Sequence, residues 1–239
     1  MHLLYIFVFF IFNWSLTNAK TETLTIGLMD SRPFFWKENG KPTGFHFEIA
    51  KALSDKMDVN LVVKEAPILR MINMLKKGDV DIVILTDHKE LDAMKAKKEF
   101  LLKLDSLIYT LSDQPITSKK EIKGTIGRLS NSCSSLQHHP GIDWLDATSY
   151  EQAYVLLKVK RIRAVCGTIA FQIVANPKQA VDGLNIKSFI ISKRALWIQA
   201  RPDFDSKRWH TIQKKIHELL SEGHINDLAK TFSKSFALI

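Results

Sequence analysis

The sequence predicts an α/β fold of two small lobes, each built on a mixed, mostly parallel sheet flanked by helices. Two observations lead to this prediction. Short apolar segments alternate with amphipathic ones over residues 24–85, and the same alternation restarts near residue 125. Each series is too short to build one large sheet. With 46% hydrophobic and 25% charged residues, the composition is that of an ordinary globular protein.

The first series contains three strands and two helices. The strands are expected at residues 24–28, 60–63 and 80–85, and the helices at residues 44–57 and 68–75. In the first helix, Phe45, Ile49 and Leu53 recur every four residues and form one apolar stripe. The second helix starts after Pro67 and stops at Gly78, as helix termini prefer. Strand–helix–strand order implies right-handed crossovers and parallel pairing.

The second series follows a charged stretch, residues 86–105, that we expect to be helical in part. Thr148 or Ser149 caps a helix, because Glu151 and Gln152 stand at capping-box distance. The last forty residues read as helices broken at Gly223. Further strands are expected at residues 125–129, 162–166, 186–191 and 196–200, and a further helix at residues 168–175.

The C-terminal helices must pack somewhere, and lying back against the first lobe would make that lobe discontinuous. The chain would then cross between lobes twice, near residues 106–111 and 192–195. Two crossings form a hinge, and the cleft between the lobes is a natural ligand site. The expected division is a first lobe of residues 20–108 plus 195–239 and a second lobe of residues 109–194.

The N-terminus predicts export. Residues 3–12 are an unbroken apolar run, and small residues follow, ending at Ala19. This order predicts a secretory signal peptide over residues 1–19 and a location in the periplasm. No Lys or Arg precedes the apolar run, so a retained membrane anchor is the alternative. That run is shorter than the roughly 20 residues that span a bilayer.

The net charge of +9 comes from lysines and arginines scattered over helix faces. No basic run alternates with aromatic residues, so we expect no nucleic-acid partner. Cys133 and Cys166 are the two cysteines of the chain, and in an oxidising compartment such a pair suggests one disulfide. No histidine pair has helical metal spacing, and no cofactor motif is present, so neither a metal nor a cofactor is expected.

Four sequence blocks resemble one known family. The opening places Pro33, a Phe pair and Gly44–Phe45 after a strand, and the next block has Arg70 on a helix that ends before Asp-x-Asp. IKGTIGRLSNSCSS and the closing SEGHINDLAKTF complete the series. In this order, they resemble a divergent member of the bacterial extracellular solute-binding proteins of family 3. That resemblance implies a type II periplasmic-binding clamshell, monomeric, that captures an amino acid or related carboxylate for a membrane permease of an ABC importer.

The resemblance also suggests where a ligand would bind, and where this chain departs from the family. Family members carry an Arg shortly after the third strand, whereas the stretch that begins at Thr86 has none. They carry an acidic residue at the position of Gly167. The residues themselves suggest three kinds of contact. The aromatic loop at residues 34–36 offers an apolar wall, and the guanidinium of Arg70 offers paired donors to a carboxylate or phosphate. The Ser-rich loop at residues 130–135 offers an anion site. The expected ligand-binding residues are Phe34, Phe35, Trp36, Arg70, Thr86, Ser130, Ser132 and Gly167.

Two other functions stay open from the sequence. The protein could present its ligand to a membrane sensor instead of a permease. The same fold hosts periplasmic dehydratases, and Glu48, Asp87 and Glu90 would then be the candidate acids or bases. Lys89 and Arg128 are further candidate cations for ligand contact. We expect binding and not catalysis, because no sequence feature indicates a carboxylate in a dry pocket.

Overall fold

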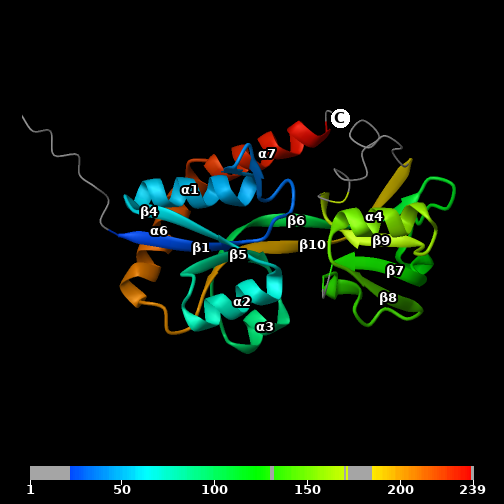
Figure 1. Cartoon of the computed structure of the whole chain (residues 1–239), viewed down its shortest axis with the longest axis horizontal. Coiled ribbons are helices and arrows are strands. Elements are labelled where there is room, and N and C mark those ends of the chain that lie inside the picture. The colour runs from blue at the N-terminus through cyan, green and yellow to red at the C-terminus, as the bar shows by residue number, and fades with distance from the viewer. Residues whose placement is uncertain (1–21, 130–131, 170, 172–184, 238–239) are drawn as a thin grey trace, which may run out of the picture.

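A computed structural model describes residues 22–129, 132–169, 171 and 185–237 of the chain. The predicted signal peptide, residues 1–19, lies outside the described residues. Figure 1 shows two lobes joined by the long strands β6 (Lys97–Leu111) and β10 (Ile186–Ala200). We call these two strands the hinge strands.

The first lobe contains most of the helices. Its strands are β1 (Thr23–Leu28), β4 (Asn60–Glu65) and β5 (Ile82–Thr86), with a short hairpin of β2 (Trp36–Glu38) and β3 (Lys41–Thr43). Its helices are α1 (Phe45–Met57), α2 (Ile68–Lys77), α3 (Lys89–Ala93), α6 (Ser206–Ser221) and α7 (His224–Ala237). Strands β4 and β5 flank β1, and both pair with it in parallel. The three strands and two crossover helices of the first series are therefore confirmed.

The second lobe repeats the pattern on a smaller scale. It contains β7 (Gly124–Leu129), β8 (Ile142–Ala147), β9 (Ala164–Gly167) and α4 (Tyr150–Lys158), with short 3-10 turns η1 (Lys119–Glu121) and η2 (Ser134–Leu136). Strands β8 and β9 lie on either side of β7 and pair with it in parallel. The full strand order is β4-β1-β5-β10-β6-β9-β7-β8, so the hinge strands join the strands of the two lobes into one eight-stranded sheet.

Apolar cores form on both faces of each sheet. In the first lobe, α1, α6 and α7 pack together and cover one face, and α2 covers the other (Figure 1). In the second lobe, α4 packs over Tyr109 and Val165, and the Cys133 and Cys166 side chains lie in a separate cluster with Ile126. The C-terminal helices thus return to the first lobe, as the sequence predicts. The lobe boundaries at residues 108/109 and 194/195 stay a prediction, because both hinge strands continue through them.

The hinge strands refine one expectation and correct another. Residues 86–105 are helical in part, as expected, but only in α3, and the charged segment that follows is the first half of β6. The segments 186–191 and 196–200 are one strand, β10, whose pairing with β6 shifts register between Ile190 and Ser192 and again between Leu196 and Trp197. Strand β8 was not expected at all, and the expected helix 168–175 falls mostly outside the described residues.

The helix ends predicted from the sequence are confirmed for α4 and α2. Ser149 caps α4, and its side chain accepts the N–H of Gln152 at 3.2 Å. The Gln152 amide oxygen in turn accepts the N–H of Thr148 at 2.6 Å, which completes a reciprocal cap. Helix α2 starts after Pro67 and ends at Gly78, whose φ of 82° suits glycine. Among the described residues, no helix is long and apolar enough to cross a membrane.

Candidate solute-binding cleft

A cavity of about 490 Å³ lies where the two lobes face each other. From the first lobe it is lined by residues that follow β1 and β4, and from the second lobe by the end of β7 and the start of α4. Both contributions come from the carboxyl ends of parallel strands or the residues just after them, where open α/β sheets bind ligands. The lining residues are Met29, Asp30, Ser31, Arg32, Glu65, Ala66, Pro67, Leu129, Thr148, Ser149, Tyr150 and Glu151.

The wall of this cavity is acidic, although the chain as a whole is basic. Asp30 and Glu65 come from the first lobe and Glu151 from the second, with Arg32 as the cation among the lining residues. Burial raises the pKa of Asp30, and the nearby charges of Glu65 and Glu151 raise it further against the opposing effect of Arg32. Glu65 also forms a salt bridge of 2.9 Å with Lys37. Such a wall would attract a cationic group of a solute.

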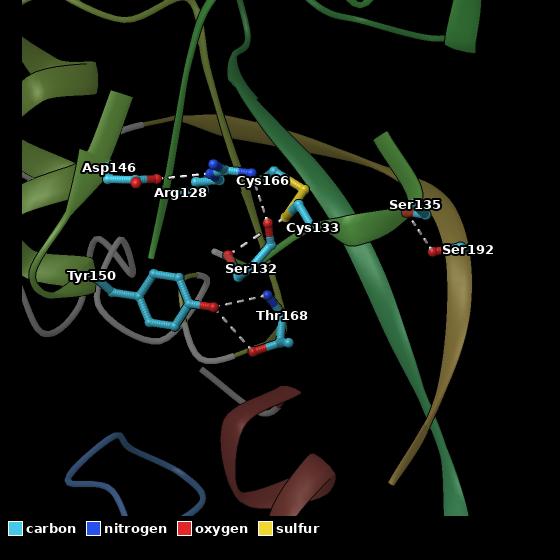
Figure 2. Close-up of a disulfide and its surroundings, with 9 residues drawn as sticks. All are labelled: Arg128, Ser132, Cys133, Ser135, Asp146, Tyr150, Cys166, Thr168 and Ser192. Atoms are coloured by element: carbon cyan, nitrogen blue, oxygen red, sulfur yellow. Dashed lines mark hydrogen bonds and ion pairs between the residues drawn. A yellow bond between two sulfur atoms is a disulfide. The ribbon is translucent and has the colours of Figure 1, made fainter. Parts of the chain in front are cut away.

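Tyr150 separates this cavity from a smaller one nearer the hinge strands. Its hydroxyl accepts the backbone N–H of Thr168 at 3.2 Å and lies 3.5 Å from the Thr168 hydroxyl (Figure 2). A Cβ atom added at Gly167 would lie 2.9 Å from a ring carbon and 3.0 Å from the hydroxyl of Tyr150. Gly167 therefore leaves the space that the Tyr150 ring needs. At the position where the family carries its acidic residue, this chain presents a phenol.

Two small cavities, each of about 40 Å³, lie beside the hinge strands. Both are lined by Thr86, Ser132 and Arg194, and Gly167 and Tyr150 line one of them. The structure thus brings together three residues that the sequence predicts as ligand contacts, namely Thr86, Ser132 and Gly167. Arg194 was not predicted, because nothing in its local sequence indicates that a residue of β10 reaches the loop after β5.

A disulfide joins Cys133 and Cys166, whose Cα atoms are 6.2 Å apart. Figure 2 shows it directly behind Ser132, linking the loop after β7 to strand β9. Both cysteines are buried in the second-lobe core. The bond therefore fixes the loop that presents Ser132 to the cleft.

Arg128 is fully engaged within the second lobe. Its Nε donates to the Asp146 carboxylate at 2.7 Å, and its Nη1 donates to the Ser132 carbonyl at 3.2 Å (Figure 2). The guanidinium also lies over the Trp144 ring, 4.4 Å from its centroid. This residue supports the Ser132 loop, and its Nε and Nη1 donors are taken up by the second lobe.

The aromatic loop packs largely onto the first lobe. Phe35 is 1% exposed and belongs to the first-lobe core, so its ligand contact stays a prediction that this packing does not favour. The reason is local, because the carbonyls of Pro33 and Phe34 accept the first N–H groups of α1, at 2.9 and 2.7 Å, and this turns the loop onto the lobe. Phe34 stacks on His46, and Trp36 packs against Phe232. Neither lines the cavities described above.

Two further predicted contacts are not placed at these cavities by the described residues. Arg70 is exposed on α2, one turn beyond the Pro67 that lines the large cavity. Ser130 lies outside the described residues. The residues that the sequence reasoning missed are Asp30, Arg32, Glu65 and Glu151. Asp30 and Arg32 immediately precede the Pro-aromatic motif, and that position was the available signal.

Metal binding finds no support in the part of the chain that the structure describes. No group of three or more His, Cys, Asp or Glu side chains there has an arrangement that could hold a metal ion.

Comparisons with known proteins agree with this architecture. Probable amino-acid-binding protein YxeM of Bacillus subtilis (strain 168) is 24% identical over 212 residues, which cover 84% of this chain and 80% of that protein. Arginine-binding extracellular protein ArtP of the same organism is 31% identical over 113 residues, 46% of this chain and 44% of that protein.

The fold is shared with solved structures as well. A crystal structure of a mutant of ArgBP from T. maritima superposes with a TM-score of 0.74 at 20% identity, covering 89% of this chain and 95% of that one. Residues 24–234 match the family model described as bacterial extracellular solute-binding proteins, family 3, which spans all the lobe-forming elements. This chain is therefore a member of the bacterial extracellular solute-binding proteins of family 3.

Proposed function

We propose that this protein captures an amino acid or a related small carboxylate between its lobes. The observation that carries the proposal is the cavity of about 490 Å³, whose walls come from both lobes at the carboxyl ends of their strands. A solute there would touch Ser31 and Glu65 on one side and Ser149 and Glu151 on the other. Contacts with both lobes favour the closed state, since only differential affinity can drive closure.

The acidic wall narrows the class of solute. Asp30, Glu65 and Glu151 would stabilise a protonated amine or guanidinium, and the names of ArtP and ArgBP support such a solute. The site we propose therefore consists of these carboxylates, the Ser31 and Ser149 hydroxyls, and the predicted residues Thr86, Ser132 and Gly167 nearer the hinge. Phe34 packs against the core clusters of both lobes and so already lies between them, whereas Trp36 and Arg70 would contribute only if closure moved them toward the cleft.

We propose further that the protein works as an exported monomer that delivers its solute to a membrane permease. Family membership supports an extracellular or periplasmic location, and the apolar residues 3–12 support export through a signal peptide. If that peptide were not removed, it would hold the protein at the membrane instead. Presentation to a membrane sensor is the alternative use of the same closed form.

Binding is favoured over catalysis. The alternative is an enzyme in which Asp30 acts as a general acid. Partial desolvation raises the pKa of Asp30, which is the direction that a general acid needs. Among the carboxylates expected from the sequence, Asp87 is bonded to Lys98, and neither Glu48 nor Glu90 lines the large cavity. Incubating the protein with each solute that binds and analysing the mixture by mass spectrometry separates the two. Unchanged solute supports binding alone, and a product would establish turnover.

Thermal unfolding against a solute panel tests the proposed function. The panel contains L-arginine, L-lysine, L-histidine, L-glutamine, succinate, phosphate and glucose. A solute at 100 times its Kd should stabilise the protein by about 2.7 kcal/mol. We expect stabilisation by amino acids, and weaker stabilisation of Glu151→Gln, with the exposed Glu38→Gln as the matched control. A well-folded protein whose unfolding temperature no compound raises would contradict the proposal.

A further inference from the structure

Arg194 carries a guanidinium from a hinge strand into the space between the lobes. It lies on β10 and lines both of the cavities of about 40 Å³, together with Thr86 of the first lobe and Ser132 of the second. Its Nη2 donates to the backbone carbonyl of Asp87, just after β5. A residue 107 positions away in sequence thereby supplies a cation to the loop where the family Arg is missing.

The charge of Arg194 has no carboxylate bonded to it among the described residues. Asp87 is close enough to attract it, but the Asp87 carboxylate accepts a hydrogen bond from Lys98 at 3.2 Å. Asp105, the other carboxylate lining these cavities, is exposed and forms no ion pair with it. Burial lowers the pKa of Arg194, which is the mark of a partly desolvated cation. Such a cation is stabilised when an anion enters beside it.

His88 adds a second donor to the same place. As the N-cap of α3, its Nδ1 accepts the N–H of Glu90 at 3.3 Å, so the ring proton of the neutral form is on Nε2. Burial lowers the pKa of His88, against the charge of Glu90, and so favours that neutral form. Nε2 is buried and has no hydrogen-bond partner in the described part of the chain. His88 lines a small cavity with Thr86, Ser132 and Arg194.

We propose that Thr86, His88, Ser132 and Arg194 bind a carboxylate of the solute at the hinge end of the cleft. This inference rests on the proposed function and assigns one end of its ligand. The guanidinium offers two parallel N–H donors that match the two carboxylate oxygens, and the His88 N–H and the two hydroxyls supply further donors. A cavity of about 40 Å³ has room for a group somewhat larger than one water molecule.

The arrangement would also couple binding to closure. Ser132 belongs to the second lobe, Thr86 and His88 to the first, and Arg194 to the strand that joins them. A carboxylate bound to all four would bridge the lobes at the hinge itself. Its opposite end would extend past Tyr150 toward the acidic cavity, so the two ends of the cleft would prefer opposite charges.

Calorimetric titration with acid and non-acid pairs tests the carboxylate site. The pairs are L-arginine with agmatine, L-histidine with histamine, and succinate with succinamide, each differing in the carboxylate. For wild-type protein we expect the acid to bind at least about tenfold more tightly than its counterpart, as loss of a charge-assisted bond implies. Arg194→Gln should remove that preference by weakening the acid alone. The exposed neighbour Lys193→Gln is the matched control and should bind as wild type.

The outcomes separate this inference from the proposed function. If an acid and its counterpart bind wild-type protein equally, the carboxylate site is overturned while solute binding stands. If Arg194→Gln binds the acid as tightly as wild type does, Arg194 is not its partner. Binding by no compound would overturn both proposals. The comparison of each acid with its counterpart in wild-type protein needs no variant. If Arg194→Gln does not fold, Arg194→Lys replaces it, because lysine keeps the positive charge but lacks the two parallel N–H donors of the guanidinium.

Discussion

At the scale of single residues, the contact between Gly167 and Tyr150 explains why this chain lacks the family's acidic residue at position 167. Gly167→Ala would place a Cβ 2.9 Å from a Tyr150 ring carbon, and we expect a loss of about 1–3 kcal/mol in the free energy of unfolding from overpacking. In a Tyr150→Leu background the same change should be far less costly. Chemical denaturation of the four proteins measures the coupling. Gly40→Ala is the control, since it is strained by its φ of 76° in open space and should show no coupling.

The contrary result would be informative about ligand recognition. If Gly167→Ala were equally tolerated in both backgrounds, the Tyr150 ring would not occupy the space beside residue 167. An acidic side chain could then be restored there without loss of stability. The phenol would no longer explain why the family's acidic residue is missing from this chain.

His46 predicts a pH dependence of stability at the same scale. It is 9% exposed, stacks on Phe34, and burial lowers its pKa from 6.5 to about 3. Below pH 6.5 the unfolded chain takes up a proton that the folded protein excludes, so this contribution to stability is lost as pH falls from 6.5 toward 3. Between pH 7 and pH 5 the loss is about 2 kcal/mol.

Replacing His46 isolates that contribution. We expect His46→Phe to lose about 2 kcal/mol less stability than wild type between pH 7 and pH 5, measured by urea unfolding at both values. His210→Phe, at an exposed position on α6, is the control and should follow wild type. An identical pH dependence for His46→Phe and wild type would show that His46 takes up its proton in the folded state.

At the scale of elements, the disulfide is the clearest stabilising device outside the cores. It closes a loop with a sequence separation of 33 between β7 and β9. The chain-entropy model assigns such a loop roughly 3–4 kcal/mol. The double variant Cys133→Ala/Cys166→Ala should therefore unfold at correspondingly lower denaturant concentration. Reducing wild-type protein should give the same shift, and reduction of the double variant should have no effect; equal stability of all forms would mean that the bond constrains nothing.

Elements differ in how far the sequence predicts them. Helices α1 and α2 were predicted closely because their apolar spacing, Pro67 and Gly78 are local signals. The first half of β6 was not, because its charged residues pattern like a solvated helix and only pairing with β10 makes it a strand. Strand β8 is held by parallel pairing with β7, which no local pattern reports. Strands that form only by pairing with a distant segment cannot be predicted from local sequence patterns.

The residues of the candidate site also divide into those that local sequence predicts and those that depend on distant contacts. Thr86, Ser132 and Gly167 were predicted from the stretches that the family resemblance aligns with ligand-binding positions, and all three line one small cavity. Arg194 was missed because its contact with Asp87 joins positions 107 apart. Phe35 packs into the core because the bonds that turn its loop run to α1, and composition alone cannot tell a ligand wall from a core. Sequence thus predicts which loops face the cleft better than which side chains do.

At the scale of the whole molecule, the two hinge strands are the connection through which the lobes can move. Their register shifts, between Ile190 and Ser192 and between Leu196 and Trp197, bound a short regular ladder that runs from Ser192 to Leu196. Bending there would swing the second lobe over the acidic cavity without disturbing either core. Closure requires only that a solute bind the closed state more tightly than the open one.

Small-angle X-ray scattering tests this closure directly. We expect the radius of gyration to fall when a stabilising amino acid is added at 100 times its Kd, because a solute that touches both lobes draws them together. Arg194→Gln with the same total solute should close less, since its affinity would be reduced. A panel member that leaves the unfolding temperature unchanged is the control and should leave the scattering unchanged. A solute that stabilises the protein while the radius of gyration stays constant would mean that the lobes are already closed, and that the cavity fills without hinge motion.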